Sequence, residues 1–396
     1  MTPAELRKVR VAILAHFFIL GAAAATWAAR LPAIKTELHL SDFQLSLALF
    51  TVPAGSVLTL ALSGRITDRL GAVRVLRVAG ALVPVLLVLI GLPRDLPLLM
   101  VVFAGYGAVA GLMDVSMNAC GARLEIAYGR PILSSLHAGY SIAGLAGAGI
   151  GGIFAGLGLG PLPTFITAAV LLLAGAVVTG RRIVLPAVVP HAERPDAAPL
   201  LPARRIAIVI AILGLLALCG QLGEGSANDW SAVYLHANLH APAGVATIGL
   251  AAFSITMAAG RMVGDRLAAR FGPVALVRVS GLIAGLGLAG GLLIAAPAVA
   301  IAGFALLGAG LAGIFPQIVS SAARLDPEHA GRNIGRIASV AYTGLLGGPV
   351  LIGALAAGVG LRNALLLPAG LALVVTACAG VMRLDVAAGK ADNNRG

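Results

Sequence analysis

Long runs of hydrophobic residues, broken by short polar segments, dominate the chain. A helix needs about 20 apolar residues to cross the hydrocarbon core of a bilayer, so runs of this length predict membrane-spanning helices. The uncharged stretch at residues 131–180 is long enough for two helices, with a turn at residues 159–163, where Gly and Pro gather. The other spans are expected at residues 11–29, 43–63, 78–92, 97–120, 206–224, 244–260, 275–294, 298–321, 334–358 and 363–382.

The distribution of positive charge predicts the orientation of these spans. Of the 28 Lys and Arg residues, 24 lie in one set of segments. This set consists of both termini, the segment between the sixth and seventh spans, and every second one of the other segments between spans. Because cytoplasmic segments carry the excess of Lys and Arg, these regions are expected in the cytoplasm. The opposite segments hold only Arg30, Lys35, Arg94 and Arg362.

A more polar segment separates the sixth span from the seventh. Residues 181–205 are rich in proline and carry Glu193, Arg194 and Asp196, which is typical of a solvated linker. The chain is therefore expected to be an all-α polytopic membrane protein with 12 transmembrane helices in two pseudo-symmetric six-helix bundles. The expected boundaries are 1–180 for the first bundle, 181–205 for a cytoplasmic linker, and 206–396 for the second bundle with a short cytoplasmic tail.

Short matches between the two halves support this division. Five matches recur at offsets of 197 to 203 residues, including Asp68-Arg69 with Asp265-Arg266. An internal duplication is typical of transporters whose two halves rock around a substrate site near the middle of the membrane. The other matches are Trp27 with Trp230, Leu38-His39 with Leu239-His240, Arg123-Leu124 with Arg324-Leu325, and Tyr140-Ser141 with Tyr342-Thr343.

Composition excludes several classes of protein. Hydrophobic residues make up 59% of the chain and charged residues 11%, which excludes a soluble globular domain and a disordered chain. The runs lack the alternation of a transmembrane β-barrel. The net charge of +12 comes from basic residues in short segments between apolar runs, so no nucleic-acid partner is expected.

Neither a metal site nor a cofactor is expected. Cys120, Cys219 and Cys378 are scattered in apolar runs, the seven histidines are dispersed, and no phosphate-binding loop is present. A membrane enzyme or a receptor is therefore disfavoured. The expected partners are a small-molecule substrate, protons and the lipid bilayer, with a monomer as the working unit. The excess of Arg over Lys (25 to 3) indicates a bacterium of high GC content and hence a bacterial inner membrane.

Polar residues within the spans are candidates for the transport chemistry, because charge inside a bilayer is costly and is usually functional. Asp114 lies well inside the span at 97–120 and is expected to carry the coupled proton; a structural pair with a cytoplasmic Arg is the alternative. Asn118 lies one helical turn away and would orient this carboxyl group or bind a substrate hydroxyl; a hydrogen bond that joins two helices is the alternative. His137 is a second candidate for proton coupling, or else a hydrogen-bonded packing residue.

The second half offers an acidic candidate near the outer end of the seventh span. Glu224, with Gln221 one turn before it, is expected to bind a proton or the substrate where the glycine-rich stretch 220–226 unwinds or bends. Asp229 lies closer to water and is expected to pair with Arg30 as an outer gate. An interfacial aromatic belt would also explain the two tryptophans of the chain. The remaining substrate-binding candidates are Tyr140, Tyr342, Gln317, Trp27 and Trp230.

Two similar loop motifs follow the second and the eighth spans. Glycine permits a tight turn, and Asp can accept hydrogen bonds from a helix N-terminus or an Arg. The motif residues are Gly64, Asp68, Arg69, Gly71 and Arg74 in the first copy, and Asp265 and Arg266 in the second, which runs from residue 260 to residue 272. Both motifs resemble the loop signature of the major facilitator superfamily, and the resemblance implies a gate in which the Asp bridges cytoplasmic helix ends of the two halves.

A narrower resemblance concerns residues 111–118, 129–137 and 224–234, which are similar to the fucose-permease-like branch of this superfamily. In fucose permeases an acid four residues before an Asn handles the proton, which implies this role for Asp114 beside Asn118. These permeases also use an Asp in the first helix. That helix here offers His16 and Thr26 instead, so the resemblance does not extend to fucose as the substrate.

These features favour a secondary active transporter that moves a small polar solute, such as a sugar or polyol, by proton-coupled alternating access. Proton-coupled efflux of drugs or amphipathic metabolites is the alternative, because few charges lie within the spans. The glycine-rich stretch at residues 144–152 resembles the antiporter signature of drug exporters, but Ala148 stands where that signature has proline.

Overall fold

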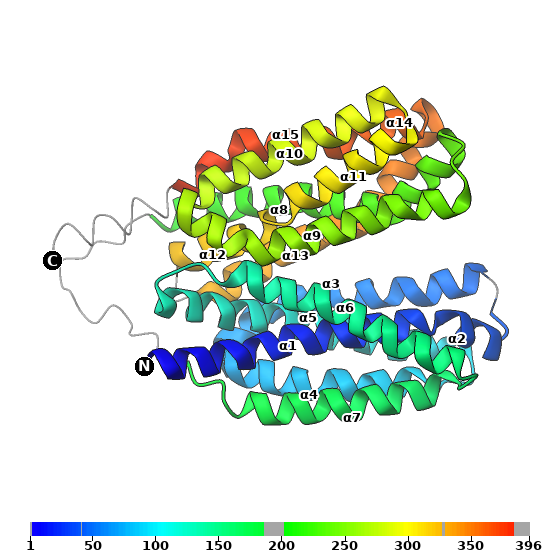
Figure 1. Ribbon diagram of the computed structural model, residues 1–396. Helices are drawn as coiled ribbons and strands as arrows, with labels where there is room; N and C mark the ends of the chain where they lie inside the picture. The colour runs from blue at the N-terminus through cyan, green and yellow to red at the C-terminus, as the bar shows by residue number, and fades with distance from the viewer. Residues whose placement is uncertain (1, 41, 186–201, 327–328, 384–396) are drawn as a thin grey trace. The chain divides into compact units, whose positions relative to one another are not determined.

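The computed structural model describes the chain except for residues 1, 41, 186–201, 327–328 and 384–396 (Figure 1). Every element within these described ranges is helical. The first half of the chain holds α1 (Pro3–Ala29), α2 (Leu31–Glu37), α3 (Asp42–Leu70), α4 (Ala72–Ile90), α5 (Leu96–Tyr128), α6 (Leu133–Gly156) and α7 (Pro161–Gly180). The second half holds α8 (Ala203–Val233), the π-helix η1 (Tyr234–Asn238), α9 (Ala243–Phe271), α10 (Pro273–Ile294), α11 (Pro297–Leu311), α12 (Ile314–Leu325), α13 (Ala330–Val359), α14 (Leu361–Ala364), α15 (Leu366–Cys378) and the 3-10 helix η2 (Ala379–Met382).

Ten helical stretches of the described chain are long and apolar enough to cross a membrane. They coincide with ten of the twelve predicted spans, and the stretch at 131–180 holds two helices, as expected. An eleventh span is present if the two parts of α3, which meet at an angle of 54°, cross the membrane together. The remaining predicted span falls on α9, which has 29 residues but does not meet the same criterion.

Two helices extend through residues that the sequence predicts as loops. α3 continues to Leu70 and α9 to Phe271, so most of each loop motif forms the last turns of a helix. The chain turns instead at single glycines, Gly71 and Gly272, whose φ angles are 84° and 80°. Positive φ angles favour glycine, which explains the abrupt change of direction. The loops predicted from residues 64 and 260 are therefore wrong, because Arg and Asp are compatible with a helix end that reaches water.

α8 is also longer than expected. The sequence predicts a span that ends at residue 224 and unwinds at residues 220–226, whereas α8 is continuous to Val233 and leads into η1. Its glycines allow close packing: a Cβ atom at Gly223 would lie 3.0 Å from the side chain of Leu311 in α11. The prediction of an unwound helix is wrong, since small residues also serve helix–helix contact.

The chain forms two compact units. The first contains Met1–Gly129 and Leu136–Val188, and the second contains Arg130–Ser135 and Val189–Gly396. The first turn of α6 therefore belongs to the second unit. The predicted linker stays a prediction, because residues 186–201 lie outside the described ranges, as does the predicted tail from residue 384.

Packing within each unit repeats the internal duplication. In the first unit, Gly107 of α5 lies directly against the carbonyl oxygen of Val52 in α3. In the second, Gly308 of α11 lies in the same way against the carbonyl oxygen of Phe253 in α9. A Cβ atom at either glycine would collide with that backbone, so each helix pair needs the glycine for its close approach.

A hydrogen bond from a threonine hydroxyl joins the same pairs of helices. The hydroxyl of Thr59 donates to the carbonyl oxygen of Ala108 at 2.9 Å, and that of Thr256 donates to the carbonyl oxygen of Ala305 at 2.6 Å. These hydrogen bonds repeat at an offset of 197 residues, whereas the glycine contacts repeat at an offset of 201. The two offsets differ by four residues, which is about one helical turn.

A matched backbone conformation marks the residues that follow α2 and η1. His39 and His240, which the sequence aligns, have φ angles of 51° and 53°. Left-handed backbone is uncommon for residues other than glycine. The halves therefore share an unusual local conformation as well as their helix packing.

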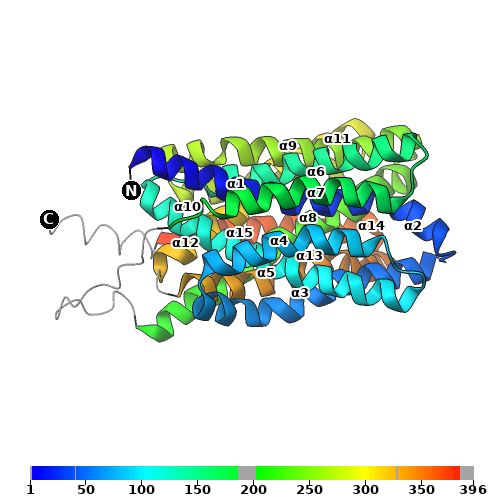
Figure 2. The ribbon, with the colours of Figure 1, turned by 90° about the horizontal axis from the view of Figure 1, so that it is seen from below.

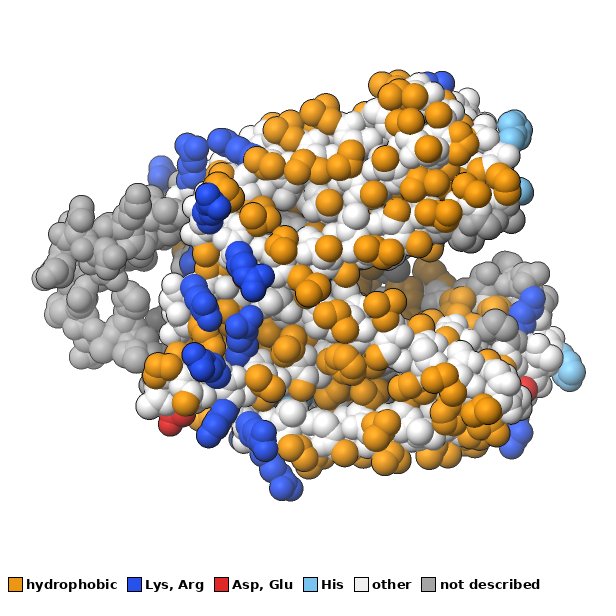
Figure 3. Space-filling model, in the orientation of Figure 1, with side chains coloured by type: hydrophobic (Ala, Val, Ile, Leu, Met, Phe, Trp, Pro, Cys, Tyr) orange, Lys and Arg blue, Asp and Glu red, His pale blue; other side chains and the backbone are white. Residues whose placement is uncertain are grey.

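The surface of each unit suits a membrane. Hydrophobic side chains cover the flanks of the helices, and in the first unit Lys and Arg gather at the end where α1 begins (Figure 3). Within this unit α1, α4 and α7 lie side by side (Figure 2). Apolar flanks with a basic end are typical of a protein that crosses a bilayer.

Candidate functional site

The centre of α5 carries two buried polar side chains on one face. Asp114 and Asn118 are one helical turn apart, as predicted. The Nδ2 atom of Asn118 donates to the Oδ1 atom of Asp114 at 3.2 Å and to the carbonyl oxygen of Asp114 at 2.9 Å. Asn118 is fully buried and Asp114 is 8% exposed. The amide therefore fixes the direction of the carboxyl group.

His137 of α6 completes this group. Its Nε2 atom lies 3.0 Å from the Oδ1 atom of Asn118. Because the Nδ2 atom of Asn118 already donates to Asp114, the Oδ1 atom is the acceptor and the imidazole carries its proton on Nε2. The ring of Phe17 in α1 packs edge-on against the imidazole, with the ring centroids 5.0 Å apart. We call Asp114, Asn118 and His137 the coupling triad.

The structure brings together three residues that the sequence singles out separately. The spacing of Asp114 and Asn118 predicts their contact, because residues four apart share a helix face. The contact with His137 joins positions 19 residues apart on two helices, so no spacing rule could give it.

An aromatic cluster lies between α1 and α5 in the same unit. The ring of Trp27 packs against Phe103 and Tyr106, with centroid distances of 5.2 and 6.0 Å. The indole Nε1 of Trp27 and the hydroxyl of Tyr106 are buried and lie near each other, and neither makes a hydrogen bond of normal geometry in the described part of the chain. Trp27 is half-buried two residues before the end of α1, and the interfacial belt stays an alternative prediction for it.

Tyr106 is a candidate that the sequence reasoning missed. It lies inside the span that carries Asp114 and is only 2% exposed. A hydroxyl in an apolar run is the same kind of signal that singled out Asp114, and it could have identified this residue. Tyr140, one turn beyond His137 on α6, is 36% exposed.

Glu224 of the second unit forms an ion pair. Its Oε2 atom lies 3.5 Å from a guanidinium nitrogen of Arg261 in α9. The prediction that Glu224 lies near the outer end of its helix is wrong, because α8 continues for nine residues beyond it. Gln221 lies three residues earlier on α8. The charge of Glu224 is therefore balanced by a residue that the sequence assigns to a loop.

Asp265 of α9 binds the first turn of α6. Its two carboxylate oxygens accept hydrogen bonds from the backbone N–H groups of Ser134 and Ser135, at 2.8 and 3.0 Å. A carboxylate at a helix N-terminus satisfies unpaired N–H groups and interacts favourably with the helix dipole. Gly264 makes this approach possible, because a Cβ atom there would lie 2.7 Å from the hydroxyl of Ser134.

Gln317 of α12 belongs to the same cluster. Its Nε2 atom lies 3.4 Å from the hydroxyl oxygen of Ser134, and its side chain is 2% exposed. The structure thus places Gln317 with Asp265, although the sequence groups it with the substrate-binding candidates. We call Asp265, Ser134, Ser135 and Gln317 the α6 cap.

The other predicted gating residues lie at helix ends or bind backbone. Arg30 is buried, and its guanidinium donates to the carbonyl oxygens of Gly151, at 3.5 Å, and of Leu159. Asp229 is exposed on α8, and its pairing with Arg30 stays a prediction. The first motif spans the end of α3 and the start of α4, where the side chains of Asp68, Arg69 and Arg74 are exposed, as is Arg266 on α9, while Gly64 is buried and Gly71 makes the turn.

The remaining aromatic candidates lie in the second unit. The ring of Trp230 packs against α13, since a Cβ atom at Gly353 would lie 3.1 Å from it. Tyr342 is half-buried on α13. Within the described ranges no group of three or more His, Cys, Asp or Glu residues could hold a metal ion.

The sequence matches the profile of a known family, the Major Facilitator Superfamily, over residues 12–316 and 213–395. The uncharacterised transporter y4wD of Sinorhizobium fredii (strain NBRC 101917 / NGR234) is 31% identical over 371 residues, covering 94% of this chain and 97% of that protein. An uncharacterised MFS-type transporter of Yersinia pestis is 32% identical over 343 residues, covering 86% of this chain and 87% of that protein.

Solved structures share the fold. The E. coli fucose:proton symporter FucP superposes with a TM-score of 0.73 and 16% identity, covering 94% of this chain and 98% of the other. The proton:xylose symporter XylE, bound to 6-bromo-6-deoxy-D-glucose, gives a TM-score of 0.73 and 12% identity, covering 95% of each chain.

Proposed function

Because the chain belongs to the major facilitator superfamily, and is a membrane transporter rather than an enzyme, we propose that it couples the movement of a small polar solute, such as a sugar or polyol, to protons by alternating access. The coupling triad is the observation that carries this proposal. Burying a carboxyl group linked to an imidazole inside an apolar helix bundle costs free energy, and residues retained at such a cost usually have a function. The fold shared with FucP and XylE, which are sugar:proton symporters, agrees with it.

Asp114 is the residue proposed to take up the proton. As a carboxylate it accepts the hydrogen bond from Asn118. A protonated carboxyl group can donate instead. Asn118 then keeps hydrogen bonds to both neighbours if its amide rotates, so that its oxygen accepts from Asp114 and its N–H donates to a lone pair on the Nε2 atom of His137. When the protonated carboxyl group donates to the amide in this way, its protonation is linked to the tautomer of His137, which gives the imidazole a role in coupling.

The substrate contacts are proposed for the aromatic cluster and the residues near the triad. Trp27 and Tyr106 offer buried donors that make no hydrogen bond of normal geometry in the described chain. A solute rich in hydroxyl oxygens would satisfy them, and leaving them unpaired costs about 1–3 kcal/mol each. Further contacts are proposed for Tyr140, and in the second unit for Gln221, Tyr342 and Trp230, while Glu224 is proposed as a second proton site.

Gating is proposed for the α6 cap. Asp265 holds the N-terminus of α6, the rest of which belongs to the first unit. Access from this end would require these two hydrogen bonds to break. The first motif, with Asp68, Arg69 and Arg74, is proposed to act in the same way, and Arg30 and Asp229 are proposed as the gate at the opposite end.

The excess of Lys and Arg supports an orientation with both termini in the cytoplasm. The bacterial relatives support a place in the bacterial inner membrane. We propose that one chain is the transporting unit, since each chain holds both pseudo-symmetric halves.

The experiment is proton movement in proteoliposomes that contain a pH-sensitive dye. Sugars, polyols, small acids and amphipathic drugs are added in turn to the wild-type protein. An inward proton flux that depends on one solute, and that Asp114→Asn abolishes while the exposed Glu37→Gln does not, supports the proposal. Proton movement out of the vesicles on addition of an amphipathic compound would instead support efflux.

A further inference from the structure

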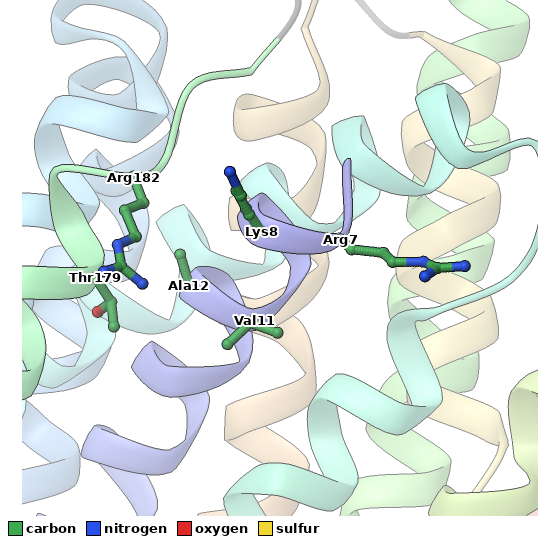
Figure 4. Close-up of a pocket in the computed structure, with 6 residues that line it drawn as sticks. All are labelled: Arg7, Lys8, Val11, Ala12, Thr179 and Arg182. Carbon is green, nitrogen blue, oxygen red and sulfur yellow. The ribbon is translucent and has the colours of Figure 1, made fainter. Parts of the chain in front are cut away.

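A basic pocket lies between α1 and α7, away from the coupling triad. It forms where α1 begins and α7 ends, and its volume is about 210 Å³. One water molecule needs about 10–15 Å³ on this measure, so the pocket has room for a larger group. Its walls combine three basic side chains with apolar ones (Figure 4). The lining residues are Arg7, Lys8, Val11, Ala12, Thr179 and Arg182.

The fold holds Arg182 in position from both sides. The guanidinium of Arg77 in α4 donates to the carbonyl oxygens of Gly180 at 2.8 Å and Ile183 at 2.9 Å. The side chain of Ile183 is fully buried. The chain on either side of Arg182 is therefore anchored, and its side chain folds back beside Thr179 (Figure 4).

The pocket keeps an excess of positive charge. Lys8 extends from α1, while Arg7 points away from α7 (Figure 4). Within the described ranges, none of the three basic side chains forms a salt bridge or a side-chain hydrogen bond. Glu5, the nearest acid along α1, accepts a hydrogen bond from the backbone N–H of Thr2 at 2.7 Å. The charge of Glu5 acts on Lys8 without forming a salt bridge, and no acid of the described chain acts in this way on Arg182, so the basic groups are available to an anion.

The surroundings of the pocket are apolar. Val11 on α1 is 60% exposed, and Val178 on α7 is 52% exposed. Val11 lies three residues after Lys8 on α1, and Val178 lies four residues before Arg182, close to the end of α7. A surface that joins cations to exposed apolar groups at a membrane edge matches a phospholipid, whose phosphate is next to its acyl chains.

We propose that this pocket binds the phosphate of an anionic phospholipid from the surrounding bilayer. Arg182 and Lys8 contact the phosphate oxygens, and a guanidinium suits this group because it can donate two parallel hydrogen bonds. The acyl chains lie along Val11 and Val178. Arg77 already donates to two carbonyl oxygens. It therefore holds the chain around Arg182 in place and does not itself bind the lipid.

The test uses the full chain in nanodiscs of equal parts phosphatidylglycerol and phosphatidylcholine. Native mass spectrometry after mild detergent extraction gives the ratio of retained anionic to zwitterionic lipid. We expect the wild type to favour phosphatidylglycerol, and Arg182→Ala and Lys8→Ala each to lower the ratio about fivefold, as for one cation near a lipid surface. Arg181→Ala is the matched control: it removes the same charge from the adjacent exposed residue, which does not line the pocket, and should leave the ratio nearly unchanged.

Three results would overturn the proposal. An equal fall for Arg181→Ala and Arg182→Ala would mean that only diffuse charge attracts lipid. Displacement of the lipid by inorganic phosphate at an equal concentration would identify a site for free phosphate. A wild type without preference for phosphatidylglycerol would exclude the site altogether. Arg182→Lys keeps the charge and should retain the preference, so it separates a loss of lipid binding from a loss of folding. The lipid ratio does not depend on transport activity.

Discussion

The Nε2 atom of His137 lies 3.0 Å from the Oδ1 atom of Asn118, and this contact connects an imidazole on α6 to a carboxyl group on α5. A single amide thus serves two titratable side chains. A change in hydrogen bonding at one side chain reaches the other when it makes the amide rotate, because the rotation exchanges the donating and the accepting end.

Asp114→Asn should separate solute movement from proton movement. Solute accumulation by the wild type should rise as the external pH falls, because more protons are available to drive it. The Asn variant lacks the titrating group, so its solute exchange should be independent of pH. Counterflow of labelled solute between pH 5.5 and 8 measures this. A variant whose exchange still follows pH would assign the proton to another residue.

Asn118→Leu should damage the triad more than its small change in size indicates. The replacement leaves Asp114 and His137 buried without their common partner, which costs about 1–3 kcal/mol. We expect a lower midpoint of thermal unfolding in detergent and a transport rate reduced roughly tenfold. His137→Gln keeps a donor for Asn118 and should lose less. Equal losses for both variants would argue against a shared amide.

Tyr106→Phe should affect affinity without affecting stability. The hydroxyl makes no hydrogen bond of normal geometry within the described chain, so its removal should change the free energy of unfolding by less than about 0.5 kcal/mol. If the hydroxyl binds the solute, KM should rise about fivefold to tenfold.

Tyr234→Phe is the matched control for that experiment. Its hydroxyl donates to the carbonyl oxygen of Leu292 at 3.4 Å. Removing this bond should cost about 0.5–1.5 kcal/mol of stability and leave KM unchanged. An unchanged KM in Tyr106→Phe would exclude its hydroxyl from the substrate site.

Gly264→Ala should destabilise the α6 cap. The new methyl group would lie 2.7 Å from the hydroxyl of Ser134, and such overpacking costs about 1–3 kcal/mol. Gly370→Ala on α15 is the control, since nothing lies within 4 Å of a Cβ atom there. Unfolding midpoints of the two variants should therefore move in opposite directions, because Ala in an open helical position is favourable by roughly 0.5–1 kcal/mol.

The pair of Glu224 and Arg261 should show coupling in a double-mutant cycle. Arg261→Ala leaves the largely buried carboxylate of Glu224 without the guanidinium 3.5 Å away. Adding Glu224→Gln removes that charge and should recover part of the loss. We expect a coupling free energy of about 1 kcal/mol, measured from unfolding midpoints. Strictly additive effects would show that the pair contributes nothing.

The sequence predicts the helical fold well because hydrophobic runs of about 20 residues have few other uses. It also predicts the contact between Asp114 and Asn118, which depends only on helical spacing. Its errors concern helix ends. α8 passes through the stretch at 220–226 without a break, because a glycine can serve either a bend or a close approach, and the two uses give the same local sequence.

Contacts between distant segments could not be predicted. The bonds from Ser134 and Ser135 to Asp265 join positions about 130 residues apart. The motif predicts that Asp265 accepts hydrogen bonds from a helix N-terminus or from an Arg, but it indicates neither which of the two nor which helix. The pairing of Arg261 with Glu224 was hidden for a further reason: the sequence assigns Arg261 to a loop, whereas α9 carries it inside the helix.

The matched packing of α3 with α5 and of α9 with α11 has a consequence for how the two halves differ. Glycine contacts and threonine hydrogen bonds occur in both copies, so both halves are built on the same scaffold. At the two offsets of the repeat, the counterparts of Asp114 are Leu311 and Phe315, both apolar. The two copies therefore share a packing scaffold but differ at this depth, where the first half carries the acid of the coupling triad and the second half an apolar side chain.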